Sequence, residues 1–281
     1  MAVEDQRTGH VRAYLEYFRD MGVHEFYRND ALPGYVAEAV EIEAVAEPEV
    51  ELSVAPDSVT ESLTPLELNI GKLVSFNELV QLPAERVPAG EKAGRLAAIA
   101  KDIGDCTRCP LAYGGRHTIV FGQGDPNARL MFVGEGPGAD EDAQGLPFVG
   151  KSGQLLNNMI AAMGLRREDV YIANIVKCRP PANRAPEPVE ANTCTQFLVR
   201  QMDVVQPEVV VALGATAATY LLGVKQSLAG LRGRWHSCRG AKLAVTYHPA
   251  FLLRDPRMKG EAWKDLQMVM KEMGLKAPAK G

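Results

Sequence analysis

Hydrophobic residues from about residue 95 onward fall into two alternating patterns. Leu130-Met131-Phe132-Val133 is a continuous apolar run that ends at Gly134, which is typical of a buried parallel strand leading into a loop. The apolar positions that follow recur at helical spacing as far as Gly164. The cycle repeats and predicts strands over 130–133, 170–176, 209–213 and 243–246, with helices over 155–163, 189–204 and 215–222.

Strands that alternate with helices predict a parallel sheet covered on both faces. We therefore expect an α/β fold, a three-layer α/β/α domain with a central parallel four-stranded sheet. In such sheets the site lies at the carboxyl ends of the strands. Here those ends carry distinctive side chains, because Glu135 follows the first strand, Asn174 lies in the second and His248 follows the last.

The first 90 residues follow a different pattern. Residues 9–22 predict a short amphipathic helix, whose apolar face consists of Val11, Tyr14, Leu15 and Phe18. Residues 37–62 carry eight acidic side chains and no basic one, which is typical of a disordered tether. We divide the chain into an acidic N-terminal extension, 1–90, and a domain, 91–281. The helix either docks a protein partner or folds back onto the domain.

Charge separates the same two parts. The chain has 281 residues and a formal net charge of −4, but residues 1–90 hold 17 acidic and 6 basic side chains, whereas residues 91–281 hold 18 and 25. The predicted domain is therefore basic, as a phosphate-binding surface would be. No run approaches 18 apolar residues and no apolar leader begins the chain, so we expect a cytoplasmic protein without a membrane segment.

Four of the five cysteines form two pairs, C-x2-C at Cys106 and Cys109 and C-x15-C at Cys178 and Cys194. Without a secretion signal, such pairs favour a metal or an iron–sulfur cluster over disulfides. Zinc binds the same thiolates, but structural zinc sites usually combine two closely spaced pairs. A four-thiolate cubane tolerates the wide second spacing. Cys238 has no partner in the pattern.

Three longer segments stand at the predicted strand ends. They read GEGPGADEDAQGLPFVGKSGQLL from Gly134, NIVKCRPPANRAP from Asn174 and TYHPAFLLR from Thr246. With both cysteine pairs in order, the chain resembles the family 4, iron–sulfur uracil-DNA glycosylases over about residues 96–275, but not over residues 1–90. The resemblance implies a monomeric base excision repair enzyme that flips uracil out of single- or double-stranded DNA and hydrolyses the N-glycosidic bond.

The resemblance also implies ligands and a substrate site. One 4Fe–4S cluster would be held by Cys106, Cys109, Cys178 and Cys194, and no soluble cofactor would be needed. His248 would donate a hydrogen bond to uracil O2, Phe148 would stack on the base, and Asn174 would distinguish uracil from cytosine. The full substrate-binding set would be Gly134, Glu135, Gly136, Gly138, Glu141, Phe148, Asn174 and His248.

Two roles are open within this set. Gly138 and Glu141 would wall off the C5 position of the base, which excludes thymine. Some other uracil glycosylases have a water-activating carboxylate near Glu135 and Gly136, and the resembled family has glycine at the second position. In addition to His248, the candidate catalytic residues are therefore Glu135 and Asn183, which would position the water. The alternative is that backbone carbonyls of the loop position it.

Contacts with DNA should be mainly to phosphates. The two leucines among the expected DNA-binding residues would enter the gap left by the flipped base. The expected residues lie in or beside the strand-end loops: Lys177, Arg179, Arg184, Leu252, Leu253 and Arg254.

The cluster would be structural, with electron transfer along DNA as the alternative. The rival functions are a non-turnover or covalently trapping uracil-DNA binding protein and an interaction protein that retains the fold.

Overall fold

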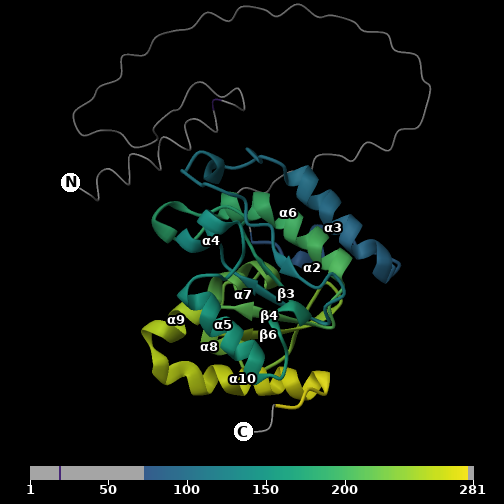
Figure 1. Cartoon of the computed structure of the whole chain (residues 1–281), viewed down its shortest axis with the longest axis vertical. Coiled ribbons are helices and arrows are strands. Elements are labelled where there is room, and N and C mark those ends of the chain that lie inside the picture. The colour runs from purple at the N-terminus through teal and green to yellow at the C-terminus, as the bar shows by residue number, and fades with distance from the viewer. Residues whose placement is uncertain (1–18, 20–72, 278–281) are drawn as a thin grey trace, which may run out of the picture.

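A mixed β-sheet lies between two layers of helices in the computed structural model (Figure 1). The structure describes Arg19 and residues 73–277. The helix expected over residues 9–22, apart from Arg19, and the acidic segment over 37–62 lie outside the described residues. In the described part of the chain, no helix combines the length and the apolar character that crossing a membrane requires.

The sheet has six strands in the order β1-β3-β2-β4-β6-β5. The inner four, β3, β2, β4 and β6, run parallel, while the edge strands β1 and β5 pair antiparallel with their neighbours. The bounds are β1 Gln123–Gly124, β2 Leu130–Gly134, β3 Tyr171–Asn174, β4 Val209–Leu213, β5 His236–Cys238 and β6 Ala241–Thr246. The four expected strands thus form the parallel centre of a mixed six-stranded sheet. The two edge strands were not expected, because they are too short to produce a periodic pattern.

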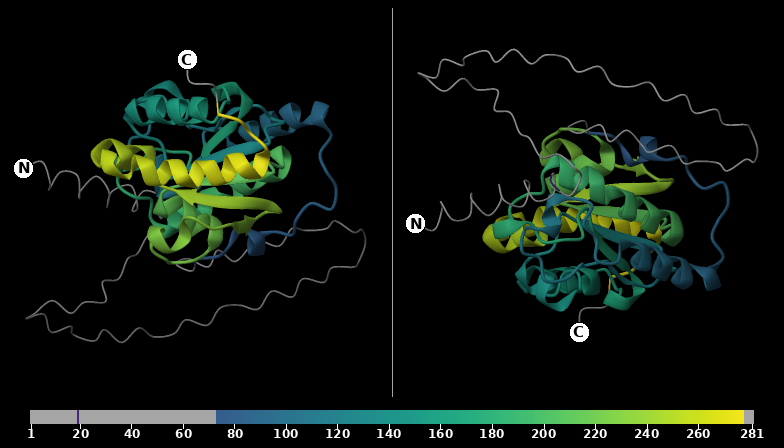
Figure 2. Two further views of the ribbon diagram at one scale, coloured as in Figure 1. Left: turned by 90° about the horizontal axis from the view of Figure 1, so that it is seen from below. Right: turned by 90° about the horizontal axis from the view of Figure 1, so that it is seen from above.

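Residues that alternate along the strands point to opposite faces and form two hydrophobic cores. In β2, Met131 and Val133 belong to one core, and Leu130 and Phe132 belong to the other. The first core is covered by α3 (Ala89–Ile103), α6 (Pro188–Val205) and α7 (Ala215–Leu222). The second core is covered by α5 (Lys151–Ala162) and α10 (Lys259–Met273), and Figure 2 shows α10 running across the sheet. The predicted coverage of both faces is therefore observed.

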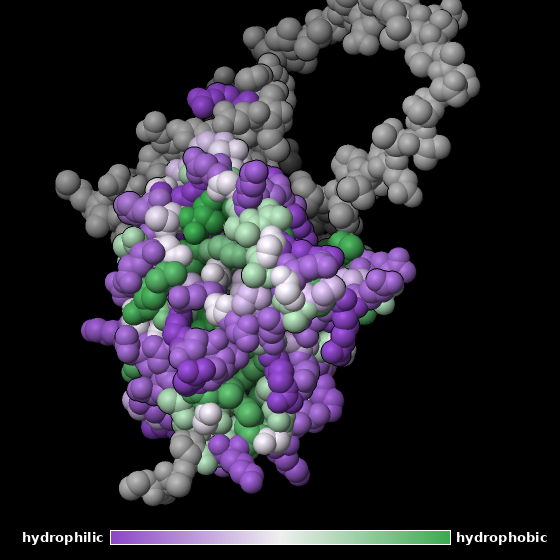
Figure 3. Space-filling view, turned by 45° about the vertical axis from the view of Figure 1, so that its right-hand side comes forward, coloured by the Kyte–Doolittle hydropathy of each residue, from purple (hydrophilic) through white to green (hydrophobic). Residues whose placement is uncertain are grey.

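Short helices and turns complete the domain. The helices are α2 (Phe76–Leu79), α4 (Ala139–Gln144), α8 (Leu228–Leu231) and α9 (Pro249–Arg254). The 3-10 turns are η1 (Pro110–Ala112), η2 (Arg167–Asp169), η3 (Pro181–Asn183) and η4 (Pro256–Met258). Hydrophilic side chains cover most of the face in Figure 3, and hydrophobic residues show there as separate patches.

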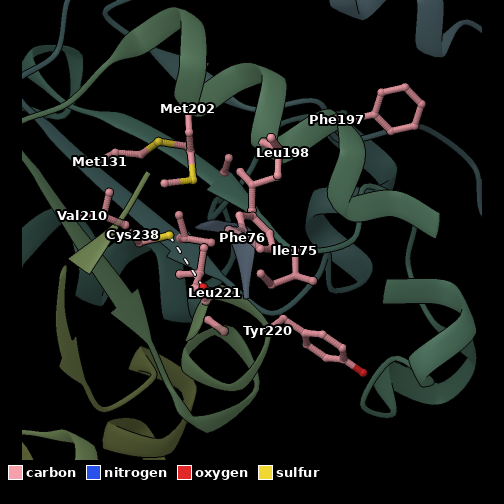
Figure 4. Close-up of a cluster of buried hydrophobic side chains, with 14 of the residues drawn as sticks. Phe76, Met131, Ile175, Phe197, Leu198, Met202, Val210, Tyr220, Leu221 and Cys238 are labelled. Carbon is pink, nitrogen blue, oxygen red and sulfur yellow. Dashed lines mark hydrogen bonds between the residues drawn. The ribbon is translucent and has the colours of Figure 1, made fainter. Parts of the chain in front are cut away.

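The segment that precedes α3 packs on the domain, although the sequence division assigned residues 73–90 to the extension. Phe76 in α2 is 0% exposed and lies among side chains of α6 and α7 (Figure 4). The guanidinium of Arg239 donates to the carbonyls of Phe76, Val80 and Gln81 and pairs with Asp203. The segment with α2 therefore packs against the domain, through contacts with residues far along the chain that sequence composition does not reveal.

Parallel strands bring three predicted segments to one edge of the sheet. Gly134 at the end of β2 is the register partner of Asn174 at the end of β3. Thr246 at the end of β6 pairs with Leu213 of β4, the strand on the other side of β2. The loops that follow these strand ends therefore converge, as expected for a doubly covered parallel sheet.

Candidate active site

A pocket of about 410 Å³ lies at this edge of the sheet. Ten residues expected from the sequence line it: Glu135, Gly136, Gly138, Glu141, Phe148, Asn174, Asn183, Arg184, His248 and Arg254. Gly134 lies behind the pocket rather than in its lining. The structure thus brings together residues that are more than 100 positions apart in the sequence, because their strands are neighbours or near neighbours in one sheet.

Asn174 presents an unsatisfied acceptor in the pocket. Its side chain is buried, and Oδ1 has no hydrogen-bond partner among the described residues. A Cβ atom on Gly134 would lie 2.4 Å from that oxygen, so glycine is required for the amide to sit so close to β2. Because a buried polar atom without a partner is costly, the geometry leaves Asn174 Oδ1 ready to accept a hydrogen bond from a ligand.

Phe148 forms a second wall of the pocket and packs near His248. The two ring centroids are 5.6 Å apart and the rings are tilted by 33°. Phe148 is buried and has a φ of 53°, a left-handed backbone conformation that is unusual for a bulky residue. Backbone strain of this kind often occurs at binding sites. The aromatic ring lines the pocket together with His248 and Asn174.

His248 is fixed in one tautomer by its own helix. It is the N-cap of α9, and its Nδ1 accepts a hydrogen bond from the backbone N–H of Ala250 at 3.1 Å. Burial lowers the pKa of His248 to about 4, and the nearby charge of Arg254 acts in the same direction. The ring is therefore neutral at pH 7 and carries its proton on Nε2. His248 can act as a neutral hydrogen-bond donor into the pocket.

Glu141 holds the loops that border the pocket. Its Oε2 accepts the backbone N–H of Gly138 at 3.0 Å, and its Oε1 accepts those of Val149 and Gly150 at 2.9 and 3.1 Å. Both carboxylate oxygens are therefore occupied by backbone donors. Glu141 fixes the position of Gly138 and of the segment that follows Phe148, and both Glu141 and Gly138 line the pocket.

The two candidates for positioning water differ in their surroundings. Glu135 is half-buried, and its carboxylate accepts no hydrogen bond from the residues that the structure describes. Asn183 is exposed, and its Oδ1 already accepts the Nε–H of Arg179 at 2.8 Å. Gly136 lies beside Glu135 in the lining. Glu135 therefore has the more available acceptor.

The expected DNA-contacting arginines differ in how available their charges are. Arg254 is exposed at the pocket, and Arg179 is partly exposed beside Asn183. Arg184 also lines the pocket, but its guanidinium pairs with the buried carboxylate of Glu190 at 2.6 Å. Its charge is therefore balanced within the protein, which leaves Arg254 and Arg179 as the more available cations.

The burial of Lys177 and of Leu252 contradicts the expectation that these side chains contact DNA. Lys177 is 1% exposed, and its Nζ donates to the Asn174 carbonyl at 3.0 Å and to Gln201 Oε1 at 2.6 Å. Leu252 is also 1% exposed, whereas Leu253 is 43% exposed. Adjacent residues on a helix point about 100° apart, so only one leucine of the pair faces solvent. Leu253 stays a candidate for DNA contact.

Cys106, Cys109, Cys178 and Cys194 line one cavity. All four are free thiols, as is Cys238, so the residues described contain no disulfide. No group of three or more His, Cys, Asp or Glu side chains in the described ranges is arranged to hold a single metal ion. The C-x2-C pair near η1 and the pair on the β3–α6 connection and α6 are nonetheless brought to a common space.

Hydrogen-bond donors point at the sulfurs of this cavity. Arg116 Nη1 donates to Cys178 Sγ at 3.2 Å, and the Lys177 backbone N–H donates to Cys194 Sγ at 3.3 Å. Burial raises the pKa of Cys109, of Cys178 and of Cys194, in the last case to about 12. Without a bound metal these thiols would stay protonated at pH 7, so metal binding must displace their protons.

Four pocket residues were not expected from the sequence: Pro137, Ser152, Pro180 and Ala250. Each lies within a quoted segment, so its neighbourhood in the chain was the available signal. A residue outside those segments was missed as well. Arg167 in η2 contacts the loop that carries Phe148, and no feature of its own sequence context indicated that contact.

Comparisons with known proteins agree with this geometry. Residues 121–267 match the model of the uracil DNA glycosylase superfamily. The chain is 46% identical to the type-4 uracil-DNA glycosylase of Thermotoga maritima over 56% of this chain and 82% of the relative. Its identity to the type-4 enzyme of Archaeoglobus fulgidus is 39%, over 64% and 94% of the two chains. The chain therefore belongs to the uracil DNA glycosylase superfamily and, within it, to the type-4 uracil-DNA glycosylases.

Proposed function

We propose that this protein excises uracil from DNA by hydrolysing the bond between uracil N1 and the deoxyribose C1′. The observation that carries the proposal is one pocket in which a neutral imidazole, an unsatisfied amide oxygen and an aromatic ring converge from three separate loops or strands. The relatives named above are uracil-DNA glycosylases. The product would be free uracil and an abasic site in the DNA.

Asn174 supplies base recognition in this proposal. Its Oδ1 accepts the N3–H of uracil, and its Nδ2 donates to O4. Cytosine has an acceptor at N3 and a donor at C4, so the same amide orientation leaves two mismatched pairs. A buried mismatched polar pair costs about 1–3 kcal/mol for each unsatisfied group. Lys177 and Gly134 support this selection, because they hold the backbone and the side chain of Asn174 in place.

His248 stabilises the leaving group. As the N1–C1′ bond breaks, its electron pair passes to the uracil ring and negative charge accumulates on O2. The Nε2–H of His248 donates to that oxygen, and the bond strengthens as the charge develops. A neutral donor suits this role, because it holds the anion without having to transfer a proton. The uracil anion takes its proton on release into water.

Glu135 positions the attacking water. The sugar becomes a cation as the base departs, and the water oxygen bonds to C1′ on the face opposite to the base. The water gives its proton to the carboxylate of Glu135, which later returns it to solvent. The available carboxylate supports Glu135 over Asn183, whose amide oxygen is occupied by Arg179. A strongly electrophilic sugar cation needs little more from the protein than a correctly placed water.

The four cysteines would hold a 4Fe–4S cluster, and the residues present fit that group. Four cysteine thiols from two segments line one cavity, and four cysteine thiolates are the usual ligands of a 4Fe–4S cluster. Hydrogen bonds to cysteine sulfurs, here to those of Cys106, Cys178 and Cys194, are typical of such centres. With these cysteines as ligands, the loop after β3 would be joined to the segment that precedes η1. This chain's residues perform the chemistry at the pocket.

Leu253 and Arg254 would contact the DNA beside the flipped nucleotide. Leu253 is an exposed apolar residue on α9, the helix that His248 begins. An apolar side chain in this position can fill the gap that the extruded base leaves in the stack. Arg254 lies next to it at the pocket and can bind a phosphate. Protein–DNA contact of this kind weakens as salt concentration rises.

Release of free base separates this proposal from its alternative, a protein that binds or covalently traps uracil-containing DNA without turnover. Purified full-length protein is incubated with uracil-containing single- and double-stranded oligonucleotides, without added metal or nucleotide. We expect free uracil and alkali-labile abasic sites, and a large loss of rate in His248→Ala and Asn174→Ala. Stoichiometric adduct without released uracil would favour the trapping alternative, and wild-type rates in both variants would contradict the proposed pocket.

A further inference from the structure

Arg167 hydrogen-bonds to the loop that carries Phe148 but does not line the base pocket. Its Nη1 donates to the Phe148 carbonyl at 3.2 Å, and its Nη2 donates to the Pro147 carbonyl at 2.5 Å. The same guanidinium donates to Asn157 Oδ1 at 2.8 Å and to Gln123 Oε1 at 3.3 Å. A planar guanidinium can bind two successive carbonyls in this way, and an ammonium group cannot. Arg167 therefore fixes both peptide groups that flank the α-carbon of Phe148.

The backbone of Phe148 needs such support. Its φ of 53° lies in the left-handed region, which a bulky residue adopts only when its surroundings hold it there. Gly153 makes room for the same carbonyl that Arg167 binds, since a Cβ on Gly153 would lie 1.9 Å from the Phe148 oxygen. The position of this peptide group thus depends both on the lack of a side chain at Gly153 and on the guanidinium of Arg167.

The carboxylate of Glu141 binds backbone N–H groups of the same loop. Glu141 Oε1 accepts the N–H groups of Val149 and Gly150, while Arg167 binds the carbonyls of the two residues before them. The three consecutive peptide groups between Pro147 and Gly150 are therefore fixed by one cation at the first two carbonyls and by one anion at the last two amides. Glu141 also lines the pocket, whereas Arg167 lies in a separate surface cleft with Gln123 and Glu168.

We propose that Arg167 is a positioning residue that holds Phe148 in the strained conformation in which its ring can stack on the extruded base. The inference rests on the proposed function, because it assumes that Phe148 stacks on uracil. Loss of the guanidinium would let the Phe148 peptide relax toward an ordinary backbone conformation and would turn the ring away from the base. The effect would fall on binding of the base more than on the bond-breaking step, since stacking acts in both the ground state and the transition state.

The test measures the affinity of free uracil for the full-length protein by calorimetry, alongside KM and kcat on a uracil-containing oligonucleotide. In Arg167→Met we expect uracil affinity to fall at least about fivefold, the lower end of what base stacking contributes. KM should rise more than kcat falls. Arg166→Met is the matched control, because Arg166 is exposed and pairs with Asp169 and Glu168 without touching the Phe148 loop. Its uracil affinity should equal that of the wild type.

A double-mutant cycle separates positioning from a general structural role. If Arg167 acts through Phe148, Arg167→Met should have no further effect on uracil affinity in the Phe148→Ala background. Additive losses would overturn the inference. Should Arg167→Met fail to fold, Arg167→Lys keeps the charge but loses the two-carbonyl contact, and its uracil affinity should fall while its melting temperature stays near that of the wild type.

Two failures can be told apart in this experiment. A wild-type protein that neither binds uracil nor releases it from DNA would overturn the proposed function itself. An active wild-type protein whose uracil affinity is unchanged in Arg167→Met and in Arg167→Lys would overturn only the role of Arg167.

Discussion

The backbone N–H of Ala250 donates to Nδ1 of His248 at 3.1 Å, so the first turn of α9 decides which ring nitrogen of His248 carries the proton. This N-cap bond leaves Nε2–H as the donor available to the pocket. A protonated ring would lose the cap, because Nδ1 could no longer accept. Helix capping and the chemistry of the pocket are thus linked through one imidazole.

The lowered pKa of His248 predicts how stability depends on pH. The pKa is about 4 in the folded protein and close to its ordinary value of 6.5 in the unfolded chain. Between these values only the unfolded chain takes up the proton, so acid favours unfolding. The contribution of His248 is fully present above about pH 6.5 and is lost as pH falls toward 4, with a slope of up to about 1.4 kcal/mol per pH unit.

Chemical denaturation at several pH values checks this dependence. The free energy of unfolding should fall less steeply below pH 6.5 in His248→Gln than in the wild type. On the wild type, kcat/KM should show no loss from His248 until the pH approaches 4. If kcat/KM of the wild type fell with a midpoint near pH 6.5, and this midpoint were absent in His248→Gln, the ring of His248 would not be held neutral.

Gly134→Ala should displace the pocket residues Asn174 and Phe148, although residue 134 does not line the pocket itself. The added Cβ would lie 2.4 Å from Asn174 Oδ1 and 2.6 Å from Phe148 Cζ, so both side chains must move. We expect a loss of at least about 10²-fold in kcat/KM, because small misplacements of positioning groups have effects of that size. Gly260→Ala is the control, since nothing lies within 4 Å of a Cβ at that position. Normal uracil release by Gly134→Ala would contradict the tight placement of Asn174.

Leu252 and Leu253 should give opposite results when changed to alanine. Leu252 is buried, and its truncation should destabilise the fold by about 2–5 kcal/mol. Leu253 is exposed, and its truncation should leave stability within about 0.5 kcal/mol. Leu253→Ala should slow uracil release from double-stranded DNA more than from single-stranded DNA, where no stack needs filling. Equal effects on both substrates would remove Leu253 from the proposed role.

Loss of a cluster ligand should be visible in the iron content. Protein purified without oxygen should contain close to four iron atoms and absorb broadly near ~400 nm. Serine at Cys106, Cys109, Cys178 or Cys194 should lower both and reduce the folded yield. Cys238→Ala serves as the control, since Cys238 packs in the hydrophobic core and donates only to the Leu221 carbonyl. Stoichiometric zinc in a colourless protein would replace the iron assignment.

Phe76→Ala should destabilise the domain although Phe76 lies before residue 91. Truncation of a fully buried aromatic typically costs about 3–5 kcal/mol. The neighbouring Glu78 is exposed, so Glu78→Ala is the matched control and should cost less than about 0.5 kcal/mol. Thermal or denaturant unfolding of the two full-length variants decides the domain boundary, and equal stability would return α2 to the extension.

Much of the site could be predicted because its residues follow strands. Continuous apolar runs identified β2 and β4, and the rule that parallel strands share an edge then placed Glu135, Asn174 and His248 together. The cysteine pairs likewise lie on one cavity, as their spacing and order suggested. These are local patterns, which sequence records directly.

Tertiary structure decided which side chains of the same type face inward. Lys177 and Arg179 are both cations near Cys178, yet Lys177 is buried against Gln201 and Arg179 is partly exposed. Leu252 and Leu253 are identical residues on one helix with opposite environments.

The sequence by itself determined the parallel sheet and the edge where functional groups gather, because strand and helix periods depend on neighbours in the chain. It did not determine the edge strands, the burial of Phe76 or the hydrogen bonds between Arg167 and the loop that carries Phe148. Each of those depends on a partner far along the chain or on the opposite side of a loop, and no short-range pattern encodes such contacts. Burial and hydrogen bonding across the fold, rather than residue type, assigned those roles.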